Sequence, residues 1–173
     1  MMPQILLIVG IFYTLITHST NGFAGSPDGA SAVEKIQSWA HDIAQKFSVP
    51  ETTPEALLEN LADKSLVIVD VREPEEVEVS TIPGSITKQA FMKNLDKFKK
   101  QKIIAFCTIG YRSSAWVKTI RQQGFDASNL RGSILMWTHI NGPLVDPQDK
   151  PTKAVHISSA PASLLAKGYL PNP

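Results

Sequence analysis

A single cysteine opens a six-residue segment, Cys107-Thr108-Ile109-Gly110-Tyr111-Arg112, between two stretches of different pattern. The apolar residues 103–106 lead into this segment and predict a strand, whereas the residues from Ser113 onward are compatible with a helix. A strand, a tight loop and a helix start, in that order, can direct several backbone N–H groups at one point. A cysteine at that point is favoured as the thiolate, which is the nucleophilic form of its side chain.

The other loop residues fit an anion-binding loop. Gly110 lies mid-loop, where a positive φ is often needed and a side chain would hinder it. Arg112 is permanently cationic and is expected to close the loop and stabilise negative charge. Thr108, Ile109 and Tyr111 are expected to set selectivity, and Tyr111 either walls the mouth or simply packs. Such a loop could hold a thiolate, the outer sulfur of a persulfide or an oxyanion, although a lone cysteine is also often buried and inert.

Composition bounds the rest of the chemistry. The chain has 173 residues, 43% of them apolar, which is enough for one domain with a core and appendages. The formal charge of +1 gives no indication of a nucleic-acid partner. One cysteine excludes an internal disulfide and a CxxC metal site, and His41, His139 and His156 have no ligand-spaced partners. We therefore expect no metal site.

The first 24 residues are typical of a signal peptide. Residues 5–16 are apolar or nearly so, which is short for a membrane span, and Gly22 and Ala24 fit the small-x-small pattern of a cleavage site. We expect cleavage after Ala24 and export to the periplasm or the medium. No Lys or Arg precedes the apolar run, so an uncleaved anchor formed by residues 5–16 is the alternative. A lone thiol in an oxidising compartment must be kept reduced or persulfidated to react.

The elements that must position the loop alternate between strands and helices. Residues 25–50 are expected to be a linker, 25–30, followed by a helix that begins at a capping box at Ser31 and Glu34 and ends before Pro50. Strands are predicted at 66–69, near Ile86, at 103–106 and at 125–130; helices are predicted from Pro54, from 74, at 91–98, 113–123 and 132–140. This alternation indicates an α/β domain with a mostly parallel sheet over residues 51–145. The Pro-rich residues 146–173 are an extension, with a short strand at 154–157 and a helical turn at 163–165, to which we assign no chemistry.

Three stretches in this order resemble the rhodanese family of sulfurtransferases. The first contains Val69-Asp70-Val71-Arg72-Glu73-Pro74-Glu75-Glu76 with Ile82-Pro83-Gly84 after it, and the second is residues 107–113. The third contains Gly124-Phe125, Asn129-Leu130-Arg131-Gly132 and Trp137. Each stretch alone is a weak signal, but their order and spacing over about residues 51–145 are specific.

The resemblance implies a five-stranded, mainly parallel sheet flanked by helices, and a two-step sulfur transfer. Cys107 would take the outer sulfur of thiosulfate or a persulfide, and cyanide, a small thiol or a protein thiol would then remove it. The family needs no metal or cofactor. Asp70 and Arg72 occupy the family's Asp-x-Arg positions, and we expect them to support the site structurally. A membrane contact is expected only if the signal segment is uncleaved.

The chain departs from the family pattern in two places. Ser80 and Thr81 replace a usual Gly-His, and Ser133 replaces a usual second glycine after Gly132. We expect these differences to lie away from the cysteine. No cationic side chain stands between Cys107 and Arg112, so binding of the thiosulfate dianion would depend on Arg112 and backbone dipoles. The lysines at 93, 97 and 100 could also attract it, but their simpler role is a solvent-exposed helix face. A persulfide or polysulfide donor is therefore an open alternative.

Two other functions are consistent with this loop. A phosphatase or arsenate reductase of the same fold would need a longer loop, with five residues between Cys and Arg, whereas four separate Cys107 from Arg112, and Phe106 rather than His precedes the cysteine. A non-enzymatic extracytoplasmic sulfur carrier or binding module would keep Cys107. Its partner could dock on the helix predicted at 31–47 or on the C-terminal extension.

Overall fold

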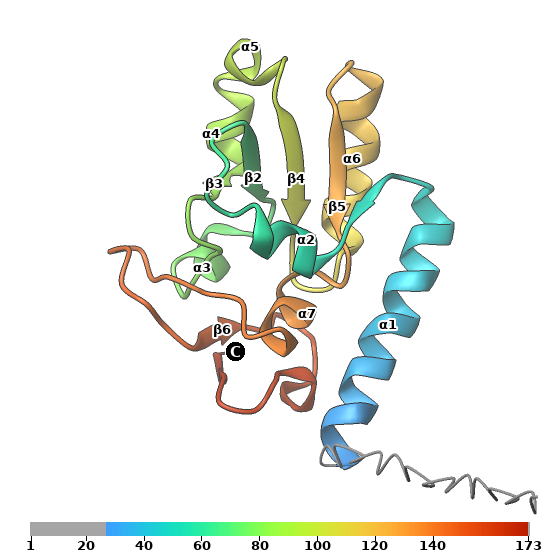
Figure 1. Cartoon of the computed structure of the whole chain (residues 1–173), viewed down its shortest axis with the longest axis vertical. Coiled ribbons are helices and arrows are strands. Elements are labelled where there is room, and N and C mark those ends of the chain that lie inside the picture. Colours follow the sequence, from blue (N-terminus) through green and yellow to red (C-terminus); the bar gives the residue numbers. More distant parts are fainter. Residues whose placement is uncertain (1–26, 173) are drawn as a thin grey trace, which may run out of the picture.

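The computed structural model describes residues 27–172, and its centre is a five-stranded sheet (Figure 1). The strands run in the order β1-β5-β4-β2-β3 and every pairing is parallel, which confirms the predicted fold class. Their bounds are Glu51–Thr52 for β1, Leu66–Asp70 for β2, Ile86–Thr87 for β3, Lys102–Phe106 for β4 and Ala127–Leu130 for β5. The predicted signal segment 1–24 lies outside the described residues. Among residues 27–172, no helix combines the length and the apolar character of a membrane span.

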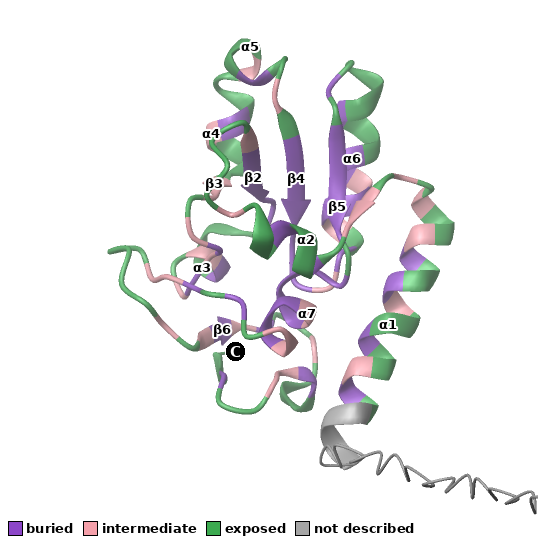
Figure 2. Cartoon of the chain, viewed as in Figure 1, coloured by how far each residue is buried: buried purple, intermediate pink, exposed green. Residues whose placement is uncertain are grey.

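The central strands are buried on both faces, as Figure 2 shows for β2, β4 and β5. Alternate side chains of β4 point to opposite faces, so Ile103 and Ala105 join one core while Ile104 and Phe106 join another. Helices α4, α5 and α6 cover the first core, and α2, α7 and part of the C-terminal extension cover the second. The carboxyl end of β4, where Cys107 follows, is therefore held between two packed layers.

The helices that flank the sheet follow the sequence prediction with one exception. Their bounds are Pro54–Glu59 for α2, Pro74–Val77 for α3, Lys88–Met92 for α4, Leu95–Phe98 for α5, Tyr111–Gln122 for α6 and Ser133–His139 for α7. The single helix predicted at 91–98 is wrong, because the chain breaks at Asn94, with φ −133° and ψ 36°. The Asn94 side chain donates to the Ala90 carbonyl oxygen, a local hydrogen bond of the kind that competes with helix continuation.

Helix α1, Pro27–Phe47, packs against α6, α7 and residues 162–164, on the side of the domain where β1 and β5 lie (Figure 1). It begins before the capping box predicted at Ser31, so part of the linker predicted at 25–30 is helical. Proline is favoured in the first turn of a helix, where its missing N–H has no intrahelical acceptor. The side chains of Ala32, Ile36 and Ala40 are buried against the domain. Strand β1 follows α1 and was not predicted, because a two-residue strand carries no periodicity.

The C-terminal extension is folded onto the domain rather than loose. Strands β6, Ala154–His156, and β7, Leu170–Asn172, pair in parallel, and the 3-10 helix η1, Ala162–Leu164, lies between them. The Ser80 hydroxyl donates to the Ala154 carbonyl oxygen at 2.6 Å, and the side chains of Val155 and Tyr169 are buried. The predicted strand and helical turn are thus present, and they are held against the same face as α7.

Candidate active site

Cys107 lies directly after β4, and the chain turns from it into α6 within three residues. The turn brings the Gly110 N–H to 3.1 Å from the Cys107 sulfur, to which it donates. Gly110 has φ +103°, and a Cβ on it would lie 3.3 Å from Asn129 Nδ2. The positive φ therefore favours glycine here, and a larger residue would also make a tight contact with the Asn129 side chain.

The start of α6 adds further polar groups beside the sulfur. The first backbone bond of the helix joins the Ser114 N–H to the Gly110 carbonyl oxygen, so the three preceding N–H groups have no acceptor within the helix. Ser113 Oγ lies 3.5 Å from the sulfur and 2.6 Å from Asn129 Oδ1, and its single proton can serve either acceptor. The N-terminus of the 12-residue helix α6 thus lies beside the Cys107 sulfur, and its dipole would stabilise negative charge placed there.

Ser133 holds the cysteine from the other side. Its hydroxyl accepts a hydrogen bond from the Cys107 N–H at 3.1 Å and donates to the Leu130 carbonyl oxygen at 3.2 Å. The expectation that this departure from the family pattern lies away from the cysteine was therefore wrong. Ser133 has φ 50°, a conformation that favours glycine, and its two hydrogen bonds offset the strain of a side chain there.

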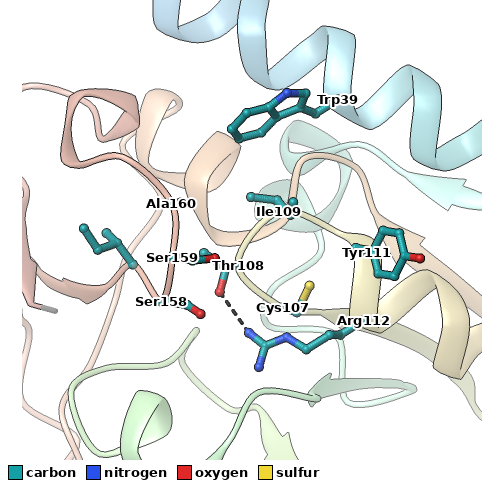
Figure 3. A pocket seen from close by; sticks show the side chains of 10 residues that line it. Trp39, Cys107, Thr108, Ile109, Tyr111, Arg112, Ser158, Ser159 and Ala160 are labelled. Carbon is teal, nitrogen blue, oxygen red and sulfur yellow. Dashed lines mark hydrogen bonds between the residues drawn. The ribbon is translucent and has the colours of Figure 1, made fainter.

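Arg112 lines the site, but its charge is already paired. Its two terminal nitrogens donate to both carboxylate oxygens of Glu76, at 2.5 Å and 2.8 Å, and one of them also donates to the Thr108 hydroxyl at 3.0 Å. The Thr108 hydroxyl in turn donates to Glu76 at 3.0 Å, and Figure 3 shows the contact between Thr108 and Arg112. The loop is therefore closed by an ion pair rather than by an unpaired guanidinium.

Glu76 is a site residue to which the sequence reading gave no role. It belongs to α3, is only 3% exposed, and also accepts a hydrogen bond from the Glu73 N–H at 3.0 Å. Burial raises the pKa of this carboxyl, but hydrogen bonds from Arg112, the Glu73 N–H and Thr108, together with the Arg112 charge, lower the pKa from 4.5 to about 2. Glu76 correspondingly raises the pKa of Arg112. The sequence pattern from Glu73 to Glu76 indicates a capping box. It could not indicate the ion pair with Arg112, 36 positions away, because the fold brings these two residues together.

Asp70 and Arg72 form a second, buried ion pair at the end of β2, outside the cavity lining. The Arg72 guanidinium donates to both Asp70 oxygens, at 2.6–3.2 Å, and to the Ser80 carbonyl oxygen at 2.6 Å. The Thr81 hydroxyl donates to Asp70 at 2.8 Å, so this departure from the family pattern completes the cluster. The structural role expected for Asp70 and Arg72 stays a prediction.

A cavity of about 190 Å³ opens over the cysteine (Figure 3). Cys107 is 1% exposed, so a reagent would reach the sulfur through this cavity. It is lined by residues from three segments: Cys107, Thr108, Ile109, Tyr111 and Arg112 from the loop, Trp39 from α1, and Ile157, Ser158, Ser159 and Ala160 from the C-terminal extension. The extension, to which we had assigned no chemistry, therefore forms one wall of the candidate site. No motif in these short segments could have indicated this placement.

Tyr111 lies at the mouth and also packs against α1. Its side chain is 43% exposed, and the Phe47 ring meets it edge-on with centroids 5.0 Å apart. The Lys46 ammonium donates to the Tyr111 hydroxyl at 2.7 Å. Both alternatives left open by the sequence thus apply, and α1 is connected to the loop through this side chain.

The three histidines in the described part of the chain each contact a hydrogen-bond partner, which for His41 is Gln45. His139 contacts the Leu164 carbonyl oxygen at 2.9 Å, and His156 Nδ1 accepts from the Ser158 N–H at 3.1 Å. Among the residues that the structure describes, no group of three or more His, Cys, Asp or Glu side chains is arranged to hold a metal ion.

Comparisons with known proteins agree with this geometry. The family model described as "Rhodanese-like domain" matches residues 53–140. The chain is 36% identical over 99 residues to a Bacillus subtilis (strain 168) protein named "Putative sulfurtransferase YtwF", covering 53% of this chain and 92% of that protein. It is 32% identical over 115 residues to a tRNA uridine(34) hydroxylase of Acaryochloris marina (strain MBIC 11017), covering 60% of this chain but only 37% of the hydroxylase.

Among solved structures, the thiosulfate sulfurtransferase of Pseudomonas aeruginosa superposes with a TM-score of 0.51. The match has 20% sequence identity and covers 66% of this chain and 23% of that one, so it supports the fold alone. The family match spans the strand, the cysteine loop and the helix that follows, which are the elements that position Cys107 and Arg112. On these grounds the chain belongs to the rhodanese-like domain family.

Proposed function

We propose that this protein is a sulfurtransferase that carries sulfur as a persulfide on Cys107. The observation that supports this most directly is the Gly110 N–H donating to the cysteine sulfur at 3.1 Å, at the N-terminus of α6 and the floor of a cavity. Hydrogen bonds to an anionic sulfur, together with the helix dipole, stabilise a thiolate and a persulfide alike. The 36% identity to a protein named a sulfurtransferase supports the same reaction class.

The first step transfers a sulfur atom to the protein. The Cys107 thiolate attacks the outer sulfur of thiosulfate, a sulfur–sulfur bond forms, and the donor's sulfur–sulfur bond breaks with its electron pair leaving on sulfite. Charge is conserved, since a thiolate and a dianion become a persulfide anion and a sulfite dianion. The new outer sulfur would lie in the cavity, within reach of N–H groups that α6 leaves unused.

The second step returns the cysteine to its starting state. A thiophilic acceptor, cyanide or a thiolate, attacks the outer sulfur of the persulfide and forms thiocyanate or a new persulfide. The Cys107 thiolate leaves with the electron pair of the broken bond. The two steps replace one difficult transfer by two displacements at sulfur, as in other covalent mechanisms. Neither step needs an added oxidant or reductant.

A steady-state assay tests this proposal. The wild type should release sulfite from thiosulfate and form thiocyanate from cyanide with parallel initial-rate lines when both substrates are varied. Cys107→Ser should lose both products while keeping the unfolding transition of the wild type. Thiocyanate formation that survives in Cys107→Ser would contradict the assignment of the nucleophile.

The rival functions predict different results in the same experiments. A phosphatase would hydrolyse p-nitrophenyl phosphate in a Cys107-dependent reaction, and the four residues between Cys107 and Arg112 argue against it. A sulfur carrier would accept one sulfur per chain and release it slowly until a protein thiol is added. Fast thiocyanate formation without any partner protein is the result that separates an enzyme from a carrier.

Export is proposed on sequence alone. The apolar residues 5–16 and the Gly22-Phe23-Ala24 segment support a cleaved signal peptide, with an uncleaved anchor as the alternative. N-terminal sequencing of the protein recovered from cell fractions tests it. A mature terminus at Gly25 outside the cytoplasm supports cleavage, an intact terminus in the membrane supports the anchor, and an intact terminus in the cytoplasm contradicts both.

A further inference from the structure

The cavity over Cys107 is mostly apolar. Trp39 and Ile109 pack against the small core formed by Ala32, Ile36, Leu135 and Leu164, and both line the cavity on one side (Figure 3). Ile157 and Ala160 contribute apolar atoms from the extension. A volume of about 190 Å³ is enough for an aromatic ring, since a cavity of about 150 Å³ holds benzene.

Charge in the cavity does not suit a dianion. Of the lining residues in the described part of the chain, Arg112 alone is charged, and both of its terminal nitrogens already bind Glu76. A dianion would have to approach the Glu76 carboxylate or displace it. Lys46 is nearby, but it is exposed and binds the Tyr111 hydroxyl, outside the cavity lining. The N–H groups near Cys107 can stabilise one negative sulfur, and Ser158 and Ser159 place hydroxyls on the facing wall (Figure 3).

We propose that Trp39 and the segment 157–160 select an organic sulfur donor: a monoanionic persulfide or thiosulfonate that carries an apolar group. This inference depends on the proposed sulfur transfer and concerns the donor only. Trp39 and Ile109 receive the apolar group, the amides at the start of α6 receive the anionic sulfur, and the serine hydroxyls donate to donor oxygens where these exist. Both selecting segments lie outside residues 53–140, so they are additions of this chain to the family domain.

The transfer balances for either donor. With a thiosulfonate, the Cys107 thiolate attacks the outer sulfur, and the sulfinate leaves with the electron pair of the broken sulfur–sulfur bond. With an organic persulfide anion, the organic thiolate leaves in the same way. One negative charge remains on the Cys107 persulfide and one on the leaving group, so the site never holds a dianion.

Three donors with the same reacting sulfur test the proposal: thiosulfate, methanethiosulfonate and benzenethiosulfonate. Each kcat/KM is divided by the donor's rate with a free thiol, which removes differences in intrinsic reactivity. The wild type should prefer benzenethiosulfonate over both other donors by at least about tenfold, as expected when an apolar group fills an apolar pocket. Trp39→Ala should reduce the preference for benzenethiosulfonate over methanethiosulfonate by about tenfold. The same change should leave kcat/KM for thiosulfate almost unchanged. Ser38→Ala, an exposed neighbour on α1, is the matched control and should leave all three values unchanged.

Two measurements keep the test decisive if Trp39→Ala does not fold. Benzenesulfinate, the leaving group of benzenethiosulfonate, should inhibit the wild type at least about tenfold more strongly than methanesulfinate. Glu76→Gln removes the negative partner of Arg112, so it should raise kcat/KM for thiosulfate relative to that for methanethiosulfonate. The proposed donor selection would be overturned if the corrected kcat/KM of the wild type were highest for thiosulfate. It would also be overturned if Trp39→Ala lowered kcat/KM equally for all three donors. If no donor transfers sulfur to Cys107, the proposed function fails instead.

Discussion

We predict that the Glu76 carboxylate, through its ion pair with Arg112 and its hydrogen bonds to Glu73 and Thr108, stabilises the protein by an amount that depends on pH. The Glu76 pKa falls from 4.5 to about 2 in the folded protein. A difference of about 2.5 in pKa corresponds to about 3 kcal/mol, at about 1.4 kcal/mol per unit. Because the Arg112 side chain is 35% exposed, we reduce the expected contribution to about 2 kcal/mol.

The sign follows from the direction of the change. A carboxyl whose pKa is lowered by folding stabilises the protein above its unfolded pKa, and it loses that contribution as pH falls through the folded value. Glu76→Gln should therefore destabilise the protein by about 2 kcal/mol near pH 7. The difference in free energy of unfolding between Glu76→Gln and the wild type should decrease below about pH 4.5, and less than half of it should remain at about pH 3.

Urea unfolding of both proteins across this pH range is the assay. The difference between the two free energies of unfolding is used, since it cancels the titration of groups they share. Glu75→Gln changes an exposed carboxylate on the same helix and should stay within about 0.5 kcal/mol of the wild type at every pH. The reasoning would be refuted if the loss of unfolding free energy in Glu76→Gln did not change with pH, or if it were below about 0.5 kcal/mol near pH 7.

Three further predictions concern the groups around the loop. Ser133→Ala removes the acceptor of the buried Cys107 N–H, so urea unfolding should show a loss of about 1–3 kcal/mol, and no loss would contradict the role given to the hydroxyl. Asp70→Asn leaves the buried Arg72 charge without its carboxylate, with the Ser80 carbonyl oxygen as the remaining acceptor, so the loss should be about 3–5 kcal/mol in the same assay. A loss under about 1 kcal/mol would show that the pair is not a main support. Gly110→Ala should strain the loop and slow sulfur transfer to the cysteine at least about tenfold. Gly124→Ala, also at positive φ but in open space, should lose stability through its backbone conformation alone and leave the transfer rate unchanged. Equal rates for both variants would contradict the role of the Gly110 N–H.

The parts of the fold that the sequence predicted are those with a local signal. The apolar runs ending at Asp70 and Phe106 identify buried strands, and the pair Thr53-Pro54 marks a helix start that the structure confirms, with the Thr53 hydroxyl accepting from the Ala56 N–H at 3.2 Å. The break at Asn94 was missed because one side-chain hydrogen bond decided it. The two-residue strand β1 was missed because so short a segment shows no alternation.

The candidate site divides in the same way. The segment from Cys107 to Arg112 could be identified, since its residue types and spacing are contiguous in the chain. Glu76, Trp39 and Ser158 could not, because their places in the site depend on packing between segments far apart in sequence. The substitution at Ser133 was assigned to the wrong region for the same reason: β5 and α7 bring it back to the end of β4.

The mass of the protein after a short exposure to benzenethiosulfonate or thiosulfate tests the central claim most directly. The account predicts a gain of one sulfur atom, located on the peptide that contains Cys107, absent in Cys107→Ser and removed by cyanide with formation of thiocyanate. A mass that stays unchanged with both donors, or an added sulfur atom that cyanide cannot remove, would contradict it.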